Sequence, residues 1–186
     1  MTRNSVVTRR ARNIRLLLAD VDGCLTNNLL FYSPDGKGGV AENKGFSSQD
    51  GIAMRWLSSP DLHLDIAMGW ISGRESIATT TRGQMLGVRY LYQNHLEKIG
   101  PYEAILADAG LTDKEVCYIG DDLPDAPIMK RAGLAVAPAN AVPEVKRIAH
   151  YVTKKEGGFG AVREVIELIL KAQGKWERIL KKYKLA

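Results

Sequence analysis

The sequence predicts an α/β fold in which helices cover both faces of a doubly wound parallel sheet. Apolar, strand-like runs alternate with helix-like segments along the chain, which is the order that gives this architecture. Residues 16–19 are also apolar at every position, as in a strand that is buried on both faces. We therefore expect a parallel core sheet accompanied by a small β-hairpin, with no large cap domain.

The elements follow from local patterns in chain order. Residues 14–19 form the first strand, and residues 29–32 and 40–46 flank the turn Ser33-Pro34-Asp35-Gly36, which predicts a hairpin. Helices are expected to end near Pro60 and at three glycines, because proline cannot continue a helix and glycine favours the left-handed position after one. The three glycines are Gly87, Gly110 and Gly133. We expect helices at 50–56, 74–86, 101–109, 124–132, 142–149 and 161–172. We expect further strands at 64–71, 88–92, 115–119, 134–137 and 151–153.

The composition is typical of one globular domain: 186 residues, 45% hydrophobic and 25% charged. No apolar run is long enough to span a bilayer. Basic residues crowd both ends, so we expect a basic tail at 1–13, a core domain at 14–173 and a basic helix or tail at 174–186. These ends are expected to be solvated. Contact with nucleic acid and attraction of anionic substrates are the alternatives.

The chain has two cysteines, Cys24 and Cys117. A disulfide is not expected, and a reducing cytoplasm is the simplest setting. Cys24 as a nucleophile is an alternative, but the three histidines form no recognisable arrangement with it. We therefore expect Cys24 to be a small packing residue.

Two acidic clusters follow two of the expected strands. Asp20 and Asp22 come directly after the first strand, where the two-residue period places both side chains on one side. The second cluster is Gly120-Asp121-Asp122-Leu123-Pro124-Asp125. Ligands collect at the carboxyl ends of parallel strands, and carboxylate oxygens suit Mg²⁺. The sequence therefore predicts a Mg²⁺ site. A loop rich in aspartate for turns and helix caps is the alternative, chiefly for Asp125.

Four short motifs occur in an order that resembles the haloacid dehalogenase superfamily of phosphohydrolases. They are Asp20-Val21-Asp22-Gly23-Cys24-Leu25-Thr26, Ile71-Ser72-Gly73-Arg74, Lys98, and Gly120-Asp121-Asp122-Leu123-Pro124-Asp125. A closer similarity is to the 3-deoxy-D-manno-octulosonate 8-phosphate phosphatases. It rests on the expected hairpin, on Phe46-Ser47-Ser48-Gln49-Asp50-Gly51 and on Gly157-Gly158-Phe159-Gly160-Ala161-Val162-Arg163-Glu164. The resemblance implies a Rossmann-like phosphatase core.

The resemblance also implies a role for each motif residue. Asp20 is the implied nucleophile, which forms an aspartyl-phosphate, and Asp22 is the implied proton donor and base. Lys98 would neutralise charge on Asp20 and the phosphate. The implied Mg²⁺ ligands are Asp20, Asp22 and Asp121.

The other motif residues have binding or supporting roles. Ser72 and Gly73 are expected to hold phosphate oxygens at the start of a helix, although Ser72 as a helix cap is not excluded by this. Arg74 either contacts substrate or forms a structural ion pair. Thr26 is expected to donate to a loop or phosphate oxygen, and Asp122 and Asp125 are expected to support the site.

The resemblance implies a phosphorylated sugar acid as substrate, most directly 3-deoxy-D-manno-octulosonate 8-phosphate, a lipopolysaccharide precursor. It also implies a homotetramer in which neighbouring subunits cover the active sites. Gln49 departs from the family, which usually has a basic residue there, and Lys44 lies nearby to compensate. Three alternatives remain: a phosphatase of nonulosonate 9-phosphates, a non-catalytic oligomeric partner of a sugar-activating enzyme, and a basic nucleic-acid-binding protein on an inactive fold.

Overall fold

The computed structural model describes residues 3–186, and side chains from residue 5 onward. Its centre is a six-stranded sheet in the order β5-β4-β1-β6-β7-β8, in which every neighbouring pair is parallel. All six strands lie within the segments predicted for them, and the parallel doubly wound sheet is confirmed. Their bounds are β1 (Leu16–Ala19), β4 (Ala67–Ile71), β5 (Tyr90–Tyr92), β6 (Val116–Ile119), β7 (Leu134–Ala137) and β8 (Tyr151–Val152).

Helices cover both faces of this sheet because successive side chains of each strand point to opposite sides. Leu17 and Ala19 of β1 belong to one apolar core, and Leu16 and Leu18 belong to the other. The first core is covered by α1 (Arg3–Ala11), α2 (Ser48–Leu57), the end of α3 (Ile77–Leu86), α7 (Ala161–Ala172) and α8 (Trp176–Lys182). The second is covered by α4 (Ile99–Ala109), α5 (Ala126–Met129) and α6 (Pro143–Ile148).

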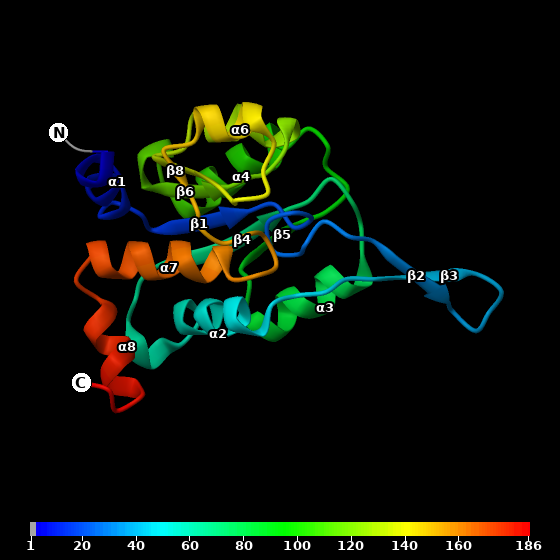
Figure 1. The fold of residues 1–186 in the computed structure, drawn as a ribbon, viewed down its shortest axis with the longest axis horizontal. Coiled ribbons are helices and arrows are strands. Elements are labelled where there is room, and N and C mark those ends of the chain that lie inside the picture. Colours follow the sequence, from blue (N-terminus) through cyan, green and yellow to red (C-terminus); the bar gives the residue numbers. More distant parts are fainter. Residues whose placement is uncertain (1–2) are drawn as a thin grey trace.

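A two-stranded antiparallel sheet, β2 (Phe31–Pro34) and β3 (Val40–Asn43), projects from the body of the molecule (Figure 1). Its turn lies at 35–39 rather than at the predicted 33–36. Asp35 shapes this turn, since its carboxylate accepts hydrogen bonds from the backbone N–H groups of Lys37 and Gly39 at 2.7 and 2.9 Å. The hairpin is the only insertion of this kind among the described residues, and the absence of a large cap is confirmed.

The N-terminal segment is not the solvated tail that its charge suggested. Residues 3–11 form helix α1, whose Val7 and Ala11 are 4% and 0% exposed within the first core. Arg9 and Arg10 therefore belong to a helix that packs on the protein. The division of the chain into domains remains a prediction. None of the helices in residues 3–186 is both long and apolar enough to cross a membrane.

Two local predictions about helices are wrong. The segment 124–132 is a 3₁₀ turn (Leu123–Asp125) followed by the short α5, because Asp122 caps the turn and Pro124 and Pro127 both interrupt backbone hydrogen bonding. Gly133 also lacks a positive φ. It is glycine because a Cβ there would lie 2.2 Å from the carbonyl oxygen of Lys114.

Candidate active site

The candidate catalytic residues meet at the carboxyl ends of three adjacent strands. Asp20 follows β1, Ser72 follows β4 and Asp121 follows β6. They line a pocket of about 200 Å³. The other lining residues are Asp22, Asn28, Gly73, Arg74, Leu96, Lys98, Asp122, Pro124 and Asp125. All of the predicted site residues except Thr26 line this pocket.

Lys98 is the cation at the floor of the pocket, and its side chain is 4% exposed. Its Nζ donates to Asp20 Oδ1 and to Asp125 Oδ1, both at 2.7 Å. Burial by itself lowers the pKa of Lys98, but the charges of Asp20 and Asp125 outweigh burial and raise that pKa above its ordinary value. Lys98 is therefore a fixed positive charge beside the expected nucleophile.

Asp20 and Asp121 are buried carboxyl groups held close together. Burial raises the pKa of Asp20 to about 6, against the opposing charge of Lys98. Burial, and then the charges of Asp20 and Asp125, raise the pKa of Asp121 to about 8. Both shifts have the same main cause, because burial disfavours the charged form of a carboxyl group, and the negative charge of Asp125 adds to it in both cases.

The donor set fits a divalent cation. Ligand atoms of Asp20, Cys24 and Asp121 lie within 4.8 Å of one another. A Cβ at Gly23, whose φ is +92°, would lie 2.0 Å from Asp121 Oδ2, so glycine is required for the backbone to pass this carboxylate. Hard carboxylate oxygens around excess negative charge are what Mg²⁺ requires.

Cys24 lies behind this site rather than in it. Its side chain is fully buried and its thiol donates to Asp121 Oδ1 at 3.6 Å. Burial raises the pKa of this thiol well above its ordinary value, which keeps it protonated and unreactive. These observations agree with the packing role expected for Cys24.

Asp125 and Asp122 organise the loop after β6. Asp125 Oδ1 accepts from the Tyr118 hydroxyl at 2.7 Å as well as from Lys98. Its Oδ2 accepts from the backbone N–H groups of Asp121 and Asp122 at 2.9 and 3.3 Å. Asp122 accepts from the N–H of Leu123 at 2.7 Å. Both residues position the loop by hydrogen bonding, in line with the supporting roles predicted for them.

Ser72 is buried, and its Oγ accepts from the N–H of Arg74 at 3.1 Å. It is not a helix cap, because α3 begins at Ile77 and its N-cap residue is Ser76. Ser72 and Gly73 thus lie in the loop before the helix and line the pocket. Thr26 does not line it: this residue is fully buried, and its hydroxyl lies 3.5 Å from the carbonyl oxygen of Val21.

The hairpin reaches the pocket through a chain of charged groups that the sequence did not predict. Lys44 Nζ donates to Asp22 Oδ1 and lies 3.3 Å from Glu42 Oε1. Glu42 Oε2 in turn accepts from Arg74 at 2.7 Å, and Arg74 also donates to the Tyr32 hydroxyl at 3.1 Å. Arg74 therefore forms a structural ion pair while it also lines the pocket. The two-residue spacing of Glu42 and Lys44 was the available signal, because it places both on one side of a strand.

A second unpredicted link joins the C-terminal glycine-rich loop to the first motif. Asn140 Nδ2 donates to the carbonyl oxygen of Gly23 at 2.9 Å, and its Oδ1 accepts from the N–H of Gly157 at 2.7 Å. A Cβ at Gly157 would lie 1.8 Å from the same carbonyl oxygen of Gly23. The two loops therefore pack backbone against backbone beside the carboxylates predicted to bind the metal.

Comparison with known proteins gives consistent matches. Residues 63–166 match the haloacid dehalogenase-like hydrolase family. The chain is 43% identical over 171 residues to 3-deoxy-D-manno-octulosonate 8-phosphate phosphatase KdsC of Yersinia pestis, covering 92% of this chain and 87% of that protein. It is 40% identical over 169 residues to the phosphatase of the same name from Escherichia coli K12, covering 91% and 86%.

Solved structures of related proteins share the fold at somewhat lower sequence identity. A putative haloacid dehalogenase superfamily hydrolase of subfamily III A from Legionella pneumophila has a TM-score of 0.88 at 36% identity, covering 99% of this chain and 97% of that one. The 3-deoxy-D-manno-octulosonate 8-phosphate phosphatase of Moraxella catarrhalis, solved with magnesium ion, phosphate ion and KDO, has a TM-score of 0.88 at 32% identity, covering 97% and 98%.

Proposed function

The chain belongs to the haloacid dehalogenase-like hydrolases and is a phosphatase related to the KdsC enzymes, and on that premise we propose that it hydrolyses 3-deoxy-D-manno-octulosonate 8-phosphate. The observation that carries the proposal is the pocket in which Asp20, Lys98 and Asp121 meet beside Ser72. The products are the free sugar acid and inorganic phosphate, and the reaction supplies a lipopolysaccharide precursor in the cytoplasm.

The residues divide the chemistry into two displacements. The Asp20 carboxylate attacks phosphorus, the phosphorus–oxygen bond to the sugar breaks, and Asp22 gives its proton to the departing sugar oxygen. Asp22 then takes a proton from a water molecule, which attacks the aspartyl-phosphate, releases phosphate and regenerates Asp20. Lys98, held by two hydrogen bonds of 2.7 Å, keeps Asp20 oriented and balances the charge of the incoming phosphate.

Asp20, Asp121 and the backbone carbonyl of Asp22 would hold Mg²⁺, which when bound supplies positive charge to the phosphate oxygens. The support is the grouping of ligand atoms, since those of Asp20, Cys24 and Asp121 lie within 4.8 Å of one another. The Moraxella catarrhalis phosphatase, at 32% identity, was solved with a magnesium ion. Ser72 and the backbone of Gly73 bind phosphate oxygens from the other side of the pocket.

The hairpin selects the sugar acid. Lys44 contacts Asp22, and its side chain is 0% exposed. It therefore supplies a cation that contacts Asp22 from behind the pocket lining. Arg74, which lines the pocket with a side chain that is 45% exposed and pairs with Glu42 of the hairpin, is the cation within reach of a substrate carboxylate. Because Gln49 replaces a basic residue of the related family, a nonulosonate 9-phosphate is the second candidate substrate.

A homotetramer would cover the open pocket. The hairpin carries four large apolar side chains that are more than half exposed: Leu29, Phe31, Tyr32 and Val40. Leu96 and Leu123 are 72% and 58% exposed beside the pocket. Apolar groups gathered in this way are typical of a contact surface. Sedimentation of the wild type and of Val40→Asp tests the assembly, and the variant is expected to form smaller particles.

Phosphate release from a panel of substrates tests the reaction. The panel contains octulosonate 8-phosphate, nonulosonate 9-phosphates, hexose phosphates and nucleotides, each with Mg²⁺. Selective release from octulosonate 8-phosphate is expected, with a loss of about a thousandfold or more in Asp20→Asn. Asp108→Asn is the matched control and should retain activity, because Asp108 is an exposed aspartate that does not line the pocket. Full activity in Asp20→Asn would exclude the proposed nucleophile, and selectivity for a 9-phosphate would favour the second substrate.

A further inference from the structure

A cationic cavity, separate from the active site, lies at the opposite end of the sheet. Its volume is about 470 Å³, and it is lined by Arg9, Arg10, Asn13, Lys114 and Gly133. These residues come from the end of α1 and from the segments that lead into β1, β6 and β7. The cavity is therefore at the amino ends of the strands, whereas the catalytic carboxylates are at the carboxyl ends. Its volume is within the range of small-molecule pockets, about 300–1,000 Å³.

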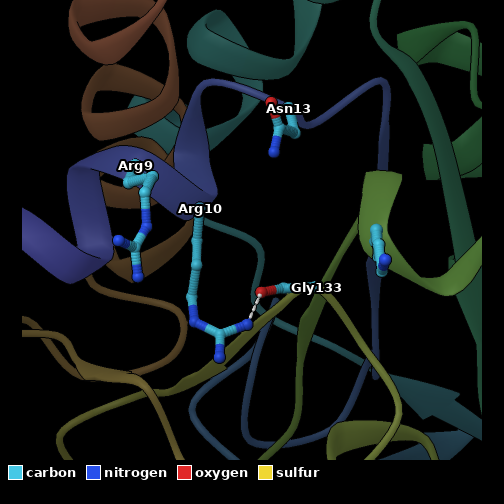
Figure 2. Close-up of a pocket in the computed structure, with 5 residues that line it drawn as sticks. Arg9, Arg10, Asn13 and Gly133 are labelled. Atoms are coloured by element: carbon cyan, nitrogen blue, oxygen red, sulfur yellow. Dashed lines mark hydrogen bonds between the residues drawn. The ribbon is translucent and has the colours of Figure 1, made fainter.

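Figure 2 shows how the basic groups are arranged. Arg9 and Arg10 leave the last turn of α1 on the same side, and Asn13 lies in the loop that follows the helix. Arg10 Nη1 donates to the carbonyl oxygen of Gly133 at 2.7 Å, which anchors the guanidinium at the cavity. The exposed Lys114 supplies a third positive charge from the loop before β6.

No carboxylate is among the five lining residues. The acids adjacent to Lys114 in the sequence are engaged elsewhere. Asp113 accepts from the Tyr102 hydroxyl at 2.7 Å and lies 3.3 Å from Arg131. Glu115 accepts from the N–H of Thr112 at 3.0 Å and pairs with Arg15 at 3.2 Å. Three cations therefore face the cavity without a carboxylate that lines it.

The dipole of α1 offsets only part of this charge. Basic residues in the last turn of a helix offset the helix dipole, but that dipole is equivalent to only about half a charge. Arg10 Nε is buried and has no hydrogen-bond partner, and such a group is costly unless a ligand satisfies it. The charge of Arg10 also acts on the neighbouring His150, whose pKa is lowered first by burial and then by that charge.

We propose that this cavity is a second anion site, which binds a small ligand carrying two adjacent phosphate groups. Three cations match a diphosphate, because each phosphate carries about −1.5 to −2 charges at neutral pH. The concave shape and the absence of aromatic rings among the lining residues favour a compact diphosphate over nucleic acid, whose bases require stacking surfaces.

Binding of inorganic pyrophosphate, measured by titration calorimetry in EDTA and about 0.15 M salt, tests the proposal. EDTA removes metal from the active site, where the uncompensated carboxylates repel anions, so the remaining binding reports the second cavity. We expect one site in the wild type and a loss of at least about tenfold in affinity in both Arg10→Gln and Lys114→Gln. Lys114→Gln serves as the second variant because it changes an exposed residue and leaves the Arg10 hydrogen bond intact.

Arg12→Gln is the matched control, since it removes the same charge from the same segment but lies outside the cavity. An equal loss of pyrophosphate affinity in Arg12→Gln would show that the anion binds to a diffuse basic surface and would overturn the proposed site. Absence of pyrophosphate binding in the wild type would also overturn the proposal. Tighter binding of duplex DNA that depends on Arg10, Arg12 and Lys114 alike would assign the surface to nucleic acid instead. Phosphatase activity should persist in all three variants, so the outcome is independent of the proposed reaction.

Discussion

Lys98→Met removes the cation that bridges two buried carboxylates and leaves the apolar part of the side chain in place. The wild-type Nζ makes one hydrogen bond of 2.7 Å to Asp20 and another of 2.7 Å to Asp125. The three side chains are 4%, 11% and 1% exposed, so solvent does not screen the interaction appreciably. The change therefore leaves negative charge buried without its partner.

The structure sets the size of the loss. Two hydrogen bonds to charged groups contribute about 3–6 kcal/mol, and breaking a buried ion pair from one side costs about 3–5 kcal/mol. Proton uptake limits the part due to Asp20 to about 1.4 kcal/mol at pH 7, because burial already raises the pKa of Asp20 to about 6 and one pKa unit corresponds to about 1.4 kcal/mol. The larger part of the loss comes from Asp125, the second carboxylate that Lys98 contacts. We therefore expect the free energy of unfolding to fall by about 3–5 kcal/mol at pH 7.

Urea unfolding of metal-free protein measures this loss. With a slope of about 2 kcal/mol per molar urea, the midpoint should fall by about 1.5–2.5 M while the slope stays unchanged. Lys130→Met is the control because Lys130 is exposed, and it should move the midpoint little. A loss below about 1 kcal/mol in Lys98→Met would refute the view that Lys98 holds the catalytic carboxylates together.

Three further outcomes are expected. Gly157→Ala should lower the free energy of unfolding by more than about 2 kcal/mol and reduce phosphate release, because its Cβ would lie 1.8 Å from the carbonyl oxygen of Gly23. Gly45→Ala is the control, since its Cβ would enter open space and should change neither quantity. Equal losses of stability in the two variants, measured by thermal unfolding, would contradict this reasoning. His150 accepts from the N–H of Ala135, and its burial lowers its pKa below 6.5. The contribution of His150 to stability should therefore decline as the pH falls below 6.5, since the unfolded chain takes up this proton first. The difference in urea midpoint between the wild type and His150→Asn should shift against the wild type over this range. EDTA should abolish phosphate release and added Mg²⁺ should restore it; activity that persists in EDTA would exclude the metal site.

The core of the fold could be predicted because its signals are local. The apolar run at 16–19 identifies a buried strand wherever the rest of the chain lies, and the predicted helix 161–172 has the same bounds as α7. Asp20 and Asp121 were predicted to meet for a related reason, because the carboxyl ends of parallel strands face one edge of the sheet. This prediction did not require knowing which strands are neighbours in the sheet.

Contacts between distant segments could not be predicted. Basic composition suggested a solvated N-terminal tail, yet Val7 and Ala11 pack into the core. The residues around Lys98 in the sequence gave no indication that its side chain would be buried. Lys98 can be buried as a charged group only because it contacts two carboxylates, which lie 78 and 27 positions away in the sequence.

The sequence by itself determined the chemistry at the sheet edge, since residue types and strand patterns are properties of short segments. Tertiary structure alone decided which charges meet. It joined the hairpin to the pocket through Lys44, Glu42 and Arg74, and it gathered Arg10 and Lys114 around a cavity at the opposite end. The reason is physical: the energy of a charge depends on its neighbours in space and on its burial, and neither is encoded in residues adjacent to it along the chain.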